Sequence, residues 1–109
     1  MAGDVERIVA VNEATAREVN EAIERGQWPG EHDRRTAYRC ECARADCNRL
    51  VRLTPQEYEG VRAHGRRFVL QPGHERPDVE RVVQRAAGYV VVAKRGPAGS
   101  IADRTDPRG

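Results

Sequence analysis

The chain has 109 residues, of which 39% are apolar, 33% charged and 5% aromatic, and its formal net charge is +2. This length fits one domain with a small core, and the charge gives little indication of a nucleic-acid or membrane partner. No apolar run approaches the roughly 20 residues of a transmembrane helix, and the N-terminus lacks the basic and apolar segments of a secretory signal. We therefore expect a cytoplasmic protein with no membrane partner.

Residues 4–25 are predicted to form one long helix, with Asp4 as the cap of its first turn. A mainly apolar stripe recurs at helical spacing along it and consists of Val5, Val9, Asn12, Ala16, Val19 and Ile23. We expect this stripe to pack on the protein's own domain. The alternative is that the helix pairs with a partner or with a second copy in a homodimer, in which case Asn12 would set the register.

The middle of the chain predicts short strands at residues 37–40 and 48–53, on either side of a cysteine-rich loop. The segment that follows, TPQE at residues 54–57, predicts a helix start. Its threonine can act as the cap, proline suits the first helical position, and glutamate can close a capping box. This helix is expected to run to about His64, and residues 67–71 are predicted to form the next strand.

Residues 79–94 allow two interpretations. Val79, Val82, Val83 and Ala86 fit one face of a helix, whereas the whole stretch also fits two β-rich runs joined by a short glycine-containing turn. We favour the hairpin. Residues 96–109 lack apolar periodicity and are predicted to be a disordered tail.

These elements predict an α+β fold in which a long N-terminal helix precedes a small, mostly antiparallel sheet with one further helix. Residues 1–95 would form a single zinc-binding domain, with the sheet and the metal site within residues 37–95.

All three cysteines lie between residues 40 and 47, as Cys40, Cys42 and Cys47 in a C-x-C-x4-C pattern. A lasting disulfide is disfavoured by the odd number and by a reducing compartment. A redox or nucleophilic role lacks an identifiable base and the C-x-x-C spacing of thiol oxidoreductases. Zinc prefers deprotonated sulfur and takes four ligands in structural sites. We therefore predict a structural Zn²⁺ ion, which would stabilise the small core.

The fourth ligand is predicted to be His74. Pro72 and Gly73 redirect the chain just before it, and the ends of the strand–helix–strand segment 50–71 can lie close together, which would return His74 to the cysteines. The alternatives are His32 in the upstream linker, His64 beside several arginines, Asp46, another oxygen ligand or a water molecule.

The C-x-C-x4-C spacing resembles the post-SET zinc motif at the C-terminus of many histone lysine methyltransferases, in which three clustered cysteines need a fourth ligand from elsewhere. The resemblance covers residues 40–50 and implies zinc. It does not imply methyl transfer, because the rest of the chain has none of the cofactor-binding or catalytic motifs of those enzymes.

Residues 37–95 are also similar to small uncharacterised actinobacterial proteins. In those proteins a C-E-C…D-C segment precedes an L-T-x-x-E-Y helix, an F-V-x-x-P-G-H turn and a V-V-x-K ending. This resemblance implies no activity. It implies that four residues act as one set, namely Cys40, Cys42, Cys47 and His74.

The function expected from these features is that of a regulatory protein-interaction module with structural zinc. Its contact surface would be the N-terminal helix or a sheet edge. An alternative is nucleic-acid binding through a cluster of Arg62, Arg66 and Arg67, although 17 acidic residues nearly balance 19 basic ones. A lesser alternative is an enzyme with a reactive thiol or a catalytic zinc. No general base is apparent and a small core leaves little room for a pocket, so no catalytic residue is assigned.

Overall fold

The structure is a computed structural model that describes residues 2–26, 34–42, 47–106 and 108, with the side chains of the first helix described from Val11 onward. Within these ranges the chain forms three helices and two antiparallel sheets, which confirms the predicted α+β class. The helices are α1 (Ala2–Arg25), α2 (Pro55–Arg62) and α3 (Gly96–Arg104), and the strands are β1 (Thr36–Arg39), β2 (Leu50–Leu53), β3 (Arg67–Leu70), β4 (Glu80–Ala86) and β5 (Tyr89–Lys94).

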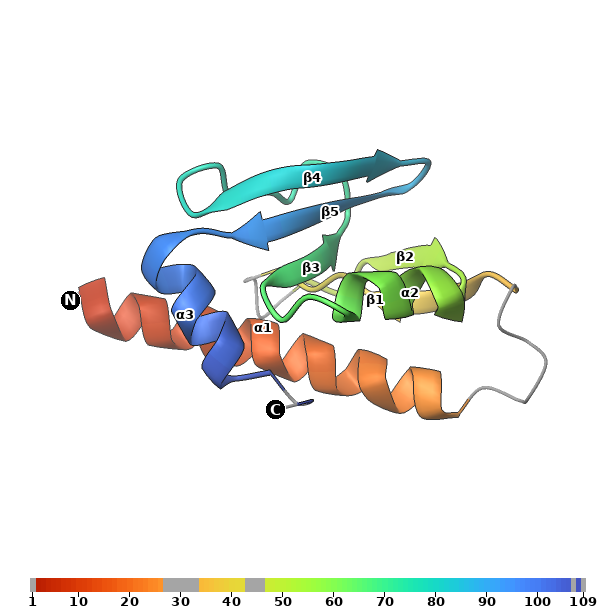
Figure 1. The fold of residues 1–109 in the computed structure, drawn as a ribbon, viewed down its shortest axis with the longest axis horizontal. Coiled ribbons are helices and arrows are strands. Elements are labelled where there is room, and N and C mark those ends of the chain that lie inside the picture. Colours follow the sequence, from red (N-terminus) through yellow and green to blue (C-terminus); the bar gives the residue numbers. More distant parts are fainter. Residues whose placement is uncertain (1, 27–33, 43–46, 107, 109) are drawn as a thin grey trace.

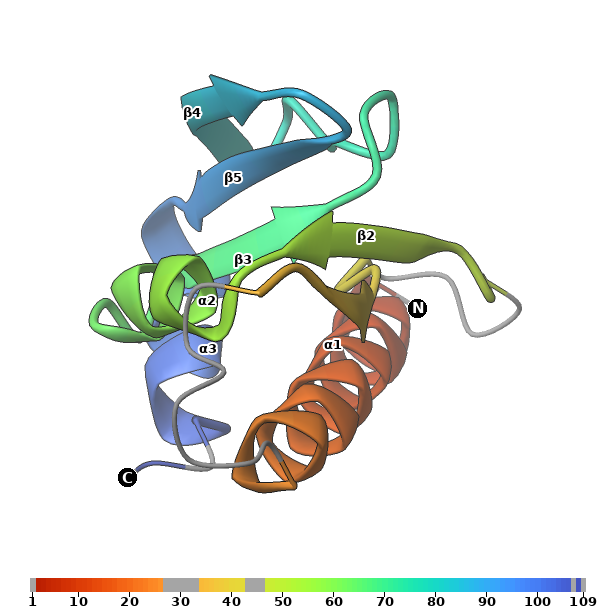
Figure 2. The ribbon, with the colours of Figure 1, turned by 90° about the vertical axis from the view of Figure 1, so that its right-hand side faces the viewer.

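The larger sheet has the strand order β3-β5-β4, and β5 is its central strand. The valines of β5 are buried because its alternating side chains enter two core clusters, Val91 one of them and Val90 and Val92 the other. β4 and β5 pair as a hairpin, so the hairpin predicted for residues 79–94 is confirmed. Figures 1 and 2 show the three strands stacked above α1, with β3 nearest to the helix and β4 farthest from it.

The smaller sheet pairs β1 with β2, from Thr36 opposite Leu53 to Arg39 opposite Leu50. The chain that leaves β1 joins the two sheets, because the N–H of Glu41 donates to the carbonyl of Val69 in β3 at 2.8 Å. A core cluster packs between the sheets and α2, and within it the rings of Tyr38 and Tyr58 stack with centroids 4.5 Å apart.

α2 begins as the sequence predicts. The N–H of Glu57 donates to the Thr54 hydroxyl at 3.0 Å, and the Glu57 carboxylate accepts from the Thr54 N–H at 2.8 Å, which completes a capping box. The helix ends at Arg62, slightly earlier than predicted. It presents Tyr58 and Val61 to the core, so this local signal fixes which face of the helix is buried.

α1 starts at Ala2, so Asp4 lies inside the helix and not at its cap. Val5 and Val9 of the predicted apolar stripe lie outside the described side chains, and the rest of the stripe is only partly buried: Ala16 is covered, but Val19 is 39% exposed. The buried face is instead largely polar, and it consists of Glu13, Ala16, Arg17, Asn20 and Glu21. Polar contacts with the rest of the chain set this orientation, and they outweigh the weak apolar periodicity. None of the described helices is long and apolar enough to cross a membrane.

The prediction of a disordered tail is wrong for residues 96–104, which form α3. The helix is held by contacts with distant parts of the chain rather than by its own periodicity. Ala102 is buried, and its carbonyl accepts a hydrogen bond from Arg17 of α1 at 3.4 Å. Asp103 pairs with Arg66 at 2.9 Å. The folded unit therefore extends past residue 95.

Candidate metal centre

The candidate metal centre is built from the two ends of the β1–β2 connection and from the turn after β3. Cys40 and Cys42 follow β1, and Cys47 precedes β2. His74 ends a turn in which its own N–H donates to the Gln71 carbonyl at 3.0 Å. Gly73 in this turn has φ of +92°, which glycine adopts without the steric cost that other residues incur.

Four ligand atoms converge at this place. The sulfur atoms of the three cysteines and a ring nitrogen of His74 all lie within 4.8 Å of one another. His74 Nδ1 lies 3.6 Å from Cys40 Sγ and 3.7 Å from Cys47 Sγ. In a tetrahedral zinc site the sulfur and nitrogen ligands are about 3.6 Å apart, given metal–ligand bonds of about 2.3 and 2.0 Å. The two measured distances therefore fit a shared tetrahedral ion.

The surroundings of Cys40 suit a metal-bound thiolate. Its sulfur accepts a hydrogen bond from the N–H of Gln71 at 3.1 Å, a contact that stabilises negative charge on sulfur. Burial raises the pKa of the Cys40 thiol, and the neighbouring thiols of Cys42 and Cys47 add to this, while the Gln71 N–H lowers it. Three thiols packed this closely cannot all ionise unless a cation balances them. This environment opposes a free thiolate nucleophile and favours a ligand set.

Glu41, between the first two cysteines, points away from the metal cluster and into the protein. Side chains alternate along an extended chain, so Cys40 and Cys42 share one side and Glu41 occupies the other. Its carboxylate is fully buried and accepts hydrogen bonds from Tyr58 at 2.7 Å, from Asn20 at 2.9 Å and from the N–H of Val69 at 3.0 Å. Burial raises the pKa of Glu41, and these three donors oppose that rise.

These contacts hold the cysteine segment against α1, α2 and β3 at once. This role of Glu41 is not among the sequence predictions. The sequence feature that could have indicated it is an acidic residue between two ligands on an extended segment, because strand alternation directs that residue away from the cysteines.

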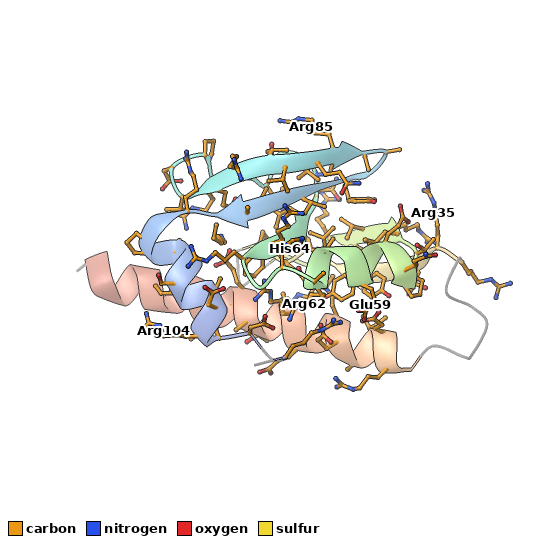
Figure 3. All side chains as sticks on the ribbon, in the orientation of Figure 1. Arg35, Glu59, Arg62, His64, Arg85 and Arg104 are labelled. Carbon is orange, nitrogen blue, oxygen red and sulfur yellow. The ribbon has the colours of Figure 1, made fainter. Side chains whose placement is uncertain are left out.

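The structure brings together Cys40, Cys42, Cys47 and His74, the four residues predicted as metal ligands. His64 is exposed at the turn after α2 (Figure 3) and is not in this cluster. His32 and Asp46, which the sequence also allows as the fourth ligand, lie outside the described residues.

The predicted arginine cluster does not form an open basic surface. Arg62 is 3% exposed and lies between α2 and α1, where it pairs with Glu21 at 2.7 Å and with Asp106 (Figure 3). Its guanidinium is therefore buried and paired within the chain, and the role of these arginines as contact residues stays a prediction. Arg66 is exposed but paired with Asp103, and Arg67 is half-buried.

Comparisons with known proteins add no assignment: no protein-family model matches the chain, and neither the curated proteins nor the solved structures include a significant match.

Proposed function

We propose that this chain is a zinc-binding domain in which the ion is structural and that it acts as a regulatory protein-interaction module. One observation carries the zinc assignment: three sulfur atoms and one imidazole nitrogen converge within 4.8 Å. Sulfur-rich tetrahedral sets select zinc over magnesium or calcium, which prefer oxygen ligands. Reduced thiols persist in a reducing compartment, so the cytoplasm is part of the proposal.

A structural role is favoured over a catalytic one by the number of ligands. Catalytic zinc keeps three protein ligands and an open position for water, whereas four protein ligands fill a tetrahedron. The cluster also links two sheets that have no ladder hydrogen bonds with each other in the described chain. An ion bound here would cross-link β1 and β2 to the end of β3.

The interaction role is supported by the outer face of α1. Val11 is 58% exposed and Val19 is 39% exposed, and Thr15 lies exposed between them at helical spacing. Isolated exposed apolar residues are ordinary, but two valines on the same face of one long helix fit a helix-to-helix contact. The partner is another protein, and a homodimer through α1 is the simplest form that this contact could take.

Native mass spectrometry with and without a chelator tests the metal and the oligomeric state together. We expect one zinc ion per chain, and we expect unfolding when the ion is removed, because the binding free energy of a structural ion is part of the folding free energy. Far-UV circular dichroism would follow the unfolding. A fold and a thermal midpoint that do not change after complete zinc removal would rule out the structural role.

Substitution of single ligands separates the structural from the catalytic arrangement. His74→Ala should lower zinc affinity and stability together, as Cys47→Ala should. His64→Ala is the matched control, because this exposed histidine lies outside the cluster. If His74→Ala retains zinc and the native fold, the ion would be held by three cysteines with an open position, and the catalytic alternative would gain.

A further inference from the structure

A hollow lies beside α3, and none of the metal-cluster residues line it. Its volume is about 340 Å³, which is within the range of small-molecule sites. Five parts of the chain line it: α1, β3, the β3–β4 connection, the end of β5, and α3 together with Thr105 that follows it.

One wall of the hollow is apolar. Phe68 and Ala102 are buried, and Val79 and Ile101 are half-buried along the same wall. Arg17 lies over the Phe68 ring at 3.6 Å from its centroid, so the ring is fixed by a cation–π contact. A preformed apolar wall of this size accommodates a branched aliphatic group.

The innermost polar groups are a buried ion triad. Lys94, the only lysine of the chain, is 4% exposed, and its ammonium group pairs with the carboxylates of Glu13 and Glu80. Lys94 donates a hydrogen bond to Glu80, which also accepts one from the N–H of Arg76 at 2.6 Å. Two carboxylates therefore meet one ammonium group here, and the guanidinium of Arg17, over the same Phe68 ring as Lys94, also acts on Glu13.

Glu13 is the carboxylate of this triad that lines the hollow, and it is 6% exposed. Beyond the ion pair with Lys94, Glu13 Oε2 accepts no hydrogen bond from the described residues. A carboxylate can accept about four hydrogen bonds, so unused acceptor capacity remains in a buried position. Burial raises the pKa of Glu13 despite the nearby ammonium of Lys94. A ligand with a cationic donor would use the remaining acceptor capacity of the Glu13 carboxylate.

The mouth of the hollow has the opposite charge. Arg76, Asp78 and Arg95 lie there with a combined charge of +1, and all are more exposed than the triad. The first turn of α3 begins at Gly96 without a side-chain cap, so its N–H groups add partial positive charge at the same place. The hollow therefore has a carboxylate at its base, a net positive charge at its mouth and an apolar wall along one side.

We propose that this hollow binds a free α-amino acid with an aliphatic side chain. The ligand's ammonium group pairs with Glu13, its carboxylate meets Arg95 and the first turn of α3, and its side chain packs on Phe68 and Ile101. This site is separate from the metal centre and does not depend on the proposed function.

Isothermal titration of the zinc-loaded full chain with three probes tests the pattern. L-leucine carries both charges, 4-methylpentanoate has the same skeleton without the ammonium group, and 3-methylbutylamine lacks the carboxylate. We expect leucine to bind and each analogue to bind at least about tenfold more weakly. Absence of binding by leucine, isoleucine and methionine up to about 10 mM would overturn the proposal. Equal binding of either analogue would also overturn it, since one charge would then suffice.

Two variants locate the ligand. Glu13→Gln should weaken leucine binding at least about tenfold, whereas Glu18→Gln, an exposed glutamate of the same helix, should leave it unchanged. Because Glu13 also pairs with Lys94, Ala98→Phe provides a second route: it fills the hollow without removing a charged group of the triad. Far-UV circular dichroism checks that each variant is folded. Unchanged leucine affinity in the folded variants would place the ligand elsewhere and refute the site.

Discussion

Asn20 Nδ2 lies 2.9 Å from Glu41 Oε2, so the residue between two cysteines of the metal cluster is bound to the C-terminal half of α1. Asn20 also holds the backbone of Arg39 from both sides: it accepts from the Arg39 N–H at 2.7 Å and donates to the Arg39 carbonyl at 2.8 Å. Arg39 and Glu41 flank Cys40. The position of α1 and the geometry of the first metal ligand are therefore coupled through one amide side chain.

Substitution of Asn20 by alanine should lower the free energy of unfolding by about 2–4 kcal/mol, because it leaves buried groups of Arg39 and Glu41 without partners. Urea denaturation of the zinc-loaded protein measures this. Thr15→Ala is the control on the same helix. Its hydroxyl is exposed and donates to the Val11 carbonyl, and we expect a change within about 0.5 kcal/mol. Equal effects of the two substitutions would contradict the coupling.

The turn that carries His74 gives a matched pair of glycine substitutions. An added Cβ at Gly73 or at Gly60 meets nothing within 4 Å, but only Gly73 has a positive φ, whereas Gly60 lies in α2. Gly73→Ala should destabilise by about 1–2 kcal/mol through backbone strain. Gly60→Ala should stabilise by about 0.5–1 kcal/mol.

The same pair separates strain from ligand placement. Competition with a chromogenic chelator should show about tenfold weaker zinc binding for Gly73→Ala, because a strain of about 1–2 kcal/mol in the zinc-bound turn corresponds to about a tenfold change in the dissociation constant. Gly60→Ala should leave the zinc affinity unchanged. Zinc affinity that is the same in both variants would show that the turn does not position His74.

Two aspartates near the C-terminal end test the contribution of α3 and the residues after it. Asp106 pairs with Arg62, whose side chain is fully buried, while Asp103 pairs with Arg66, whose side chain is 47% exposed. Asp106→Asn weakens the neutralisation of a buried cation and should cost about 1–3 kcal/mol. Asp103→Asn should cost less than about 1 kcal/mol, because solvent screens that pair. Thermal and urea denaturation compare the two, and a reversed order would contradict the described packing.

Glu24 gives the stability a dependence on pH. Its pKa is raised from 4.5 to about 8, chiefly by burial and further by the neighbouring carboxyl of Glu59, although Arg108 opposes the rise. The folded state therefore holds a proton that the unfolded state releases near 4.5. This contribution to stability is complete below pH 4.5 and is lost as the pH rises towards about 8.

Comparison with Glu24→Gln isolates this contribution, because glutamine stays uncharged and the metal ligands titrate equally in both proteins. From pH 5 to pH 8, the wild type should lose stability relative to Glu24→Gln in urea denaturation. Glu18→Gln, which changes an exposed glutamate, should differ from the wild type by a constant amount. A constant difference for Glu24→Gln as well would contradict the raised pKa.

The features predicted correctly from the sequence are those that short segments determine. The capping box at Thr54 and the hairpin over residues 80–94 follow from local side chains and turn residues. The convergence of the four proposed ligand residues followed because three cysteines lie within eight residues of one another and because Pro72 and Gly73 indicate a turn before His74. In each case the deciding signal lies within a few residues of the element that it specifies.

The features that the sequence did not predict depend on distant partners. Arg17 is buried because carbonyls of Gly65 and Arg67 accept its hydrogen bonds at 2.6 and 2.8 Å, and nothing near it in sequence indicates this. α3 contains Gly96 and Gly99, which weaken helix propensity, so its order depends on tertiary contacts that composition does not show. A polar residue on a helix is ordinarily assigned to the solvent face. This rule fails where buried backbone carbonyls need a hydrogen-bond donor from that residue.

The buried polar face of α1 also sets an order of events during synthesis. α1 precedes both sheets in the chain, but Arg17 bonds to a carbonyl 85 residues later, and Glu21 binds Arg108, 87 residues later. Until α3 has emerged, the guanidinium of Arg17 and the carboxylate of Glu21 lack these partners. The β1–β2 and β4–β5 pairs join segments that are close in sequence and can form without these late contacts. Asn20 can bond to Arg39 and Glu41 as soon as the cysteine segment is made, so the contacts of α1 fall into an early set and a late set that depends on residues 102–108.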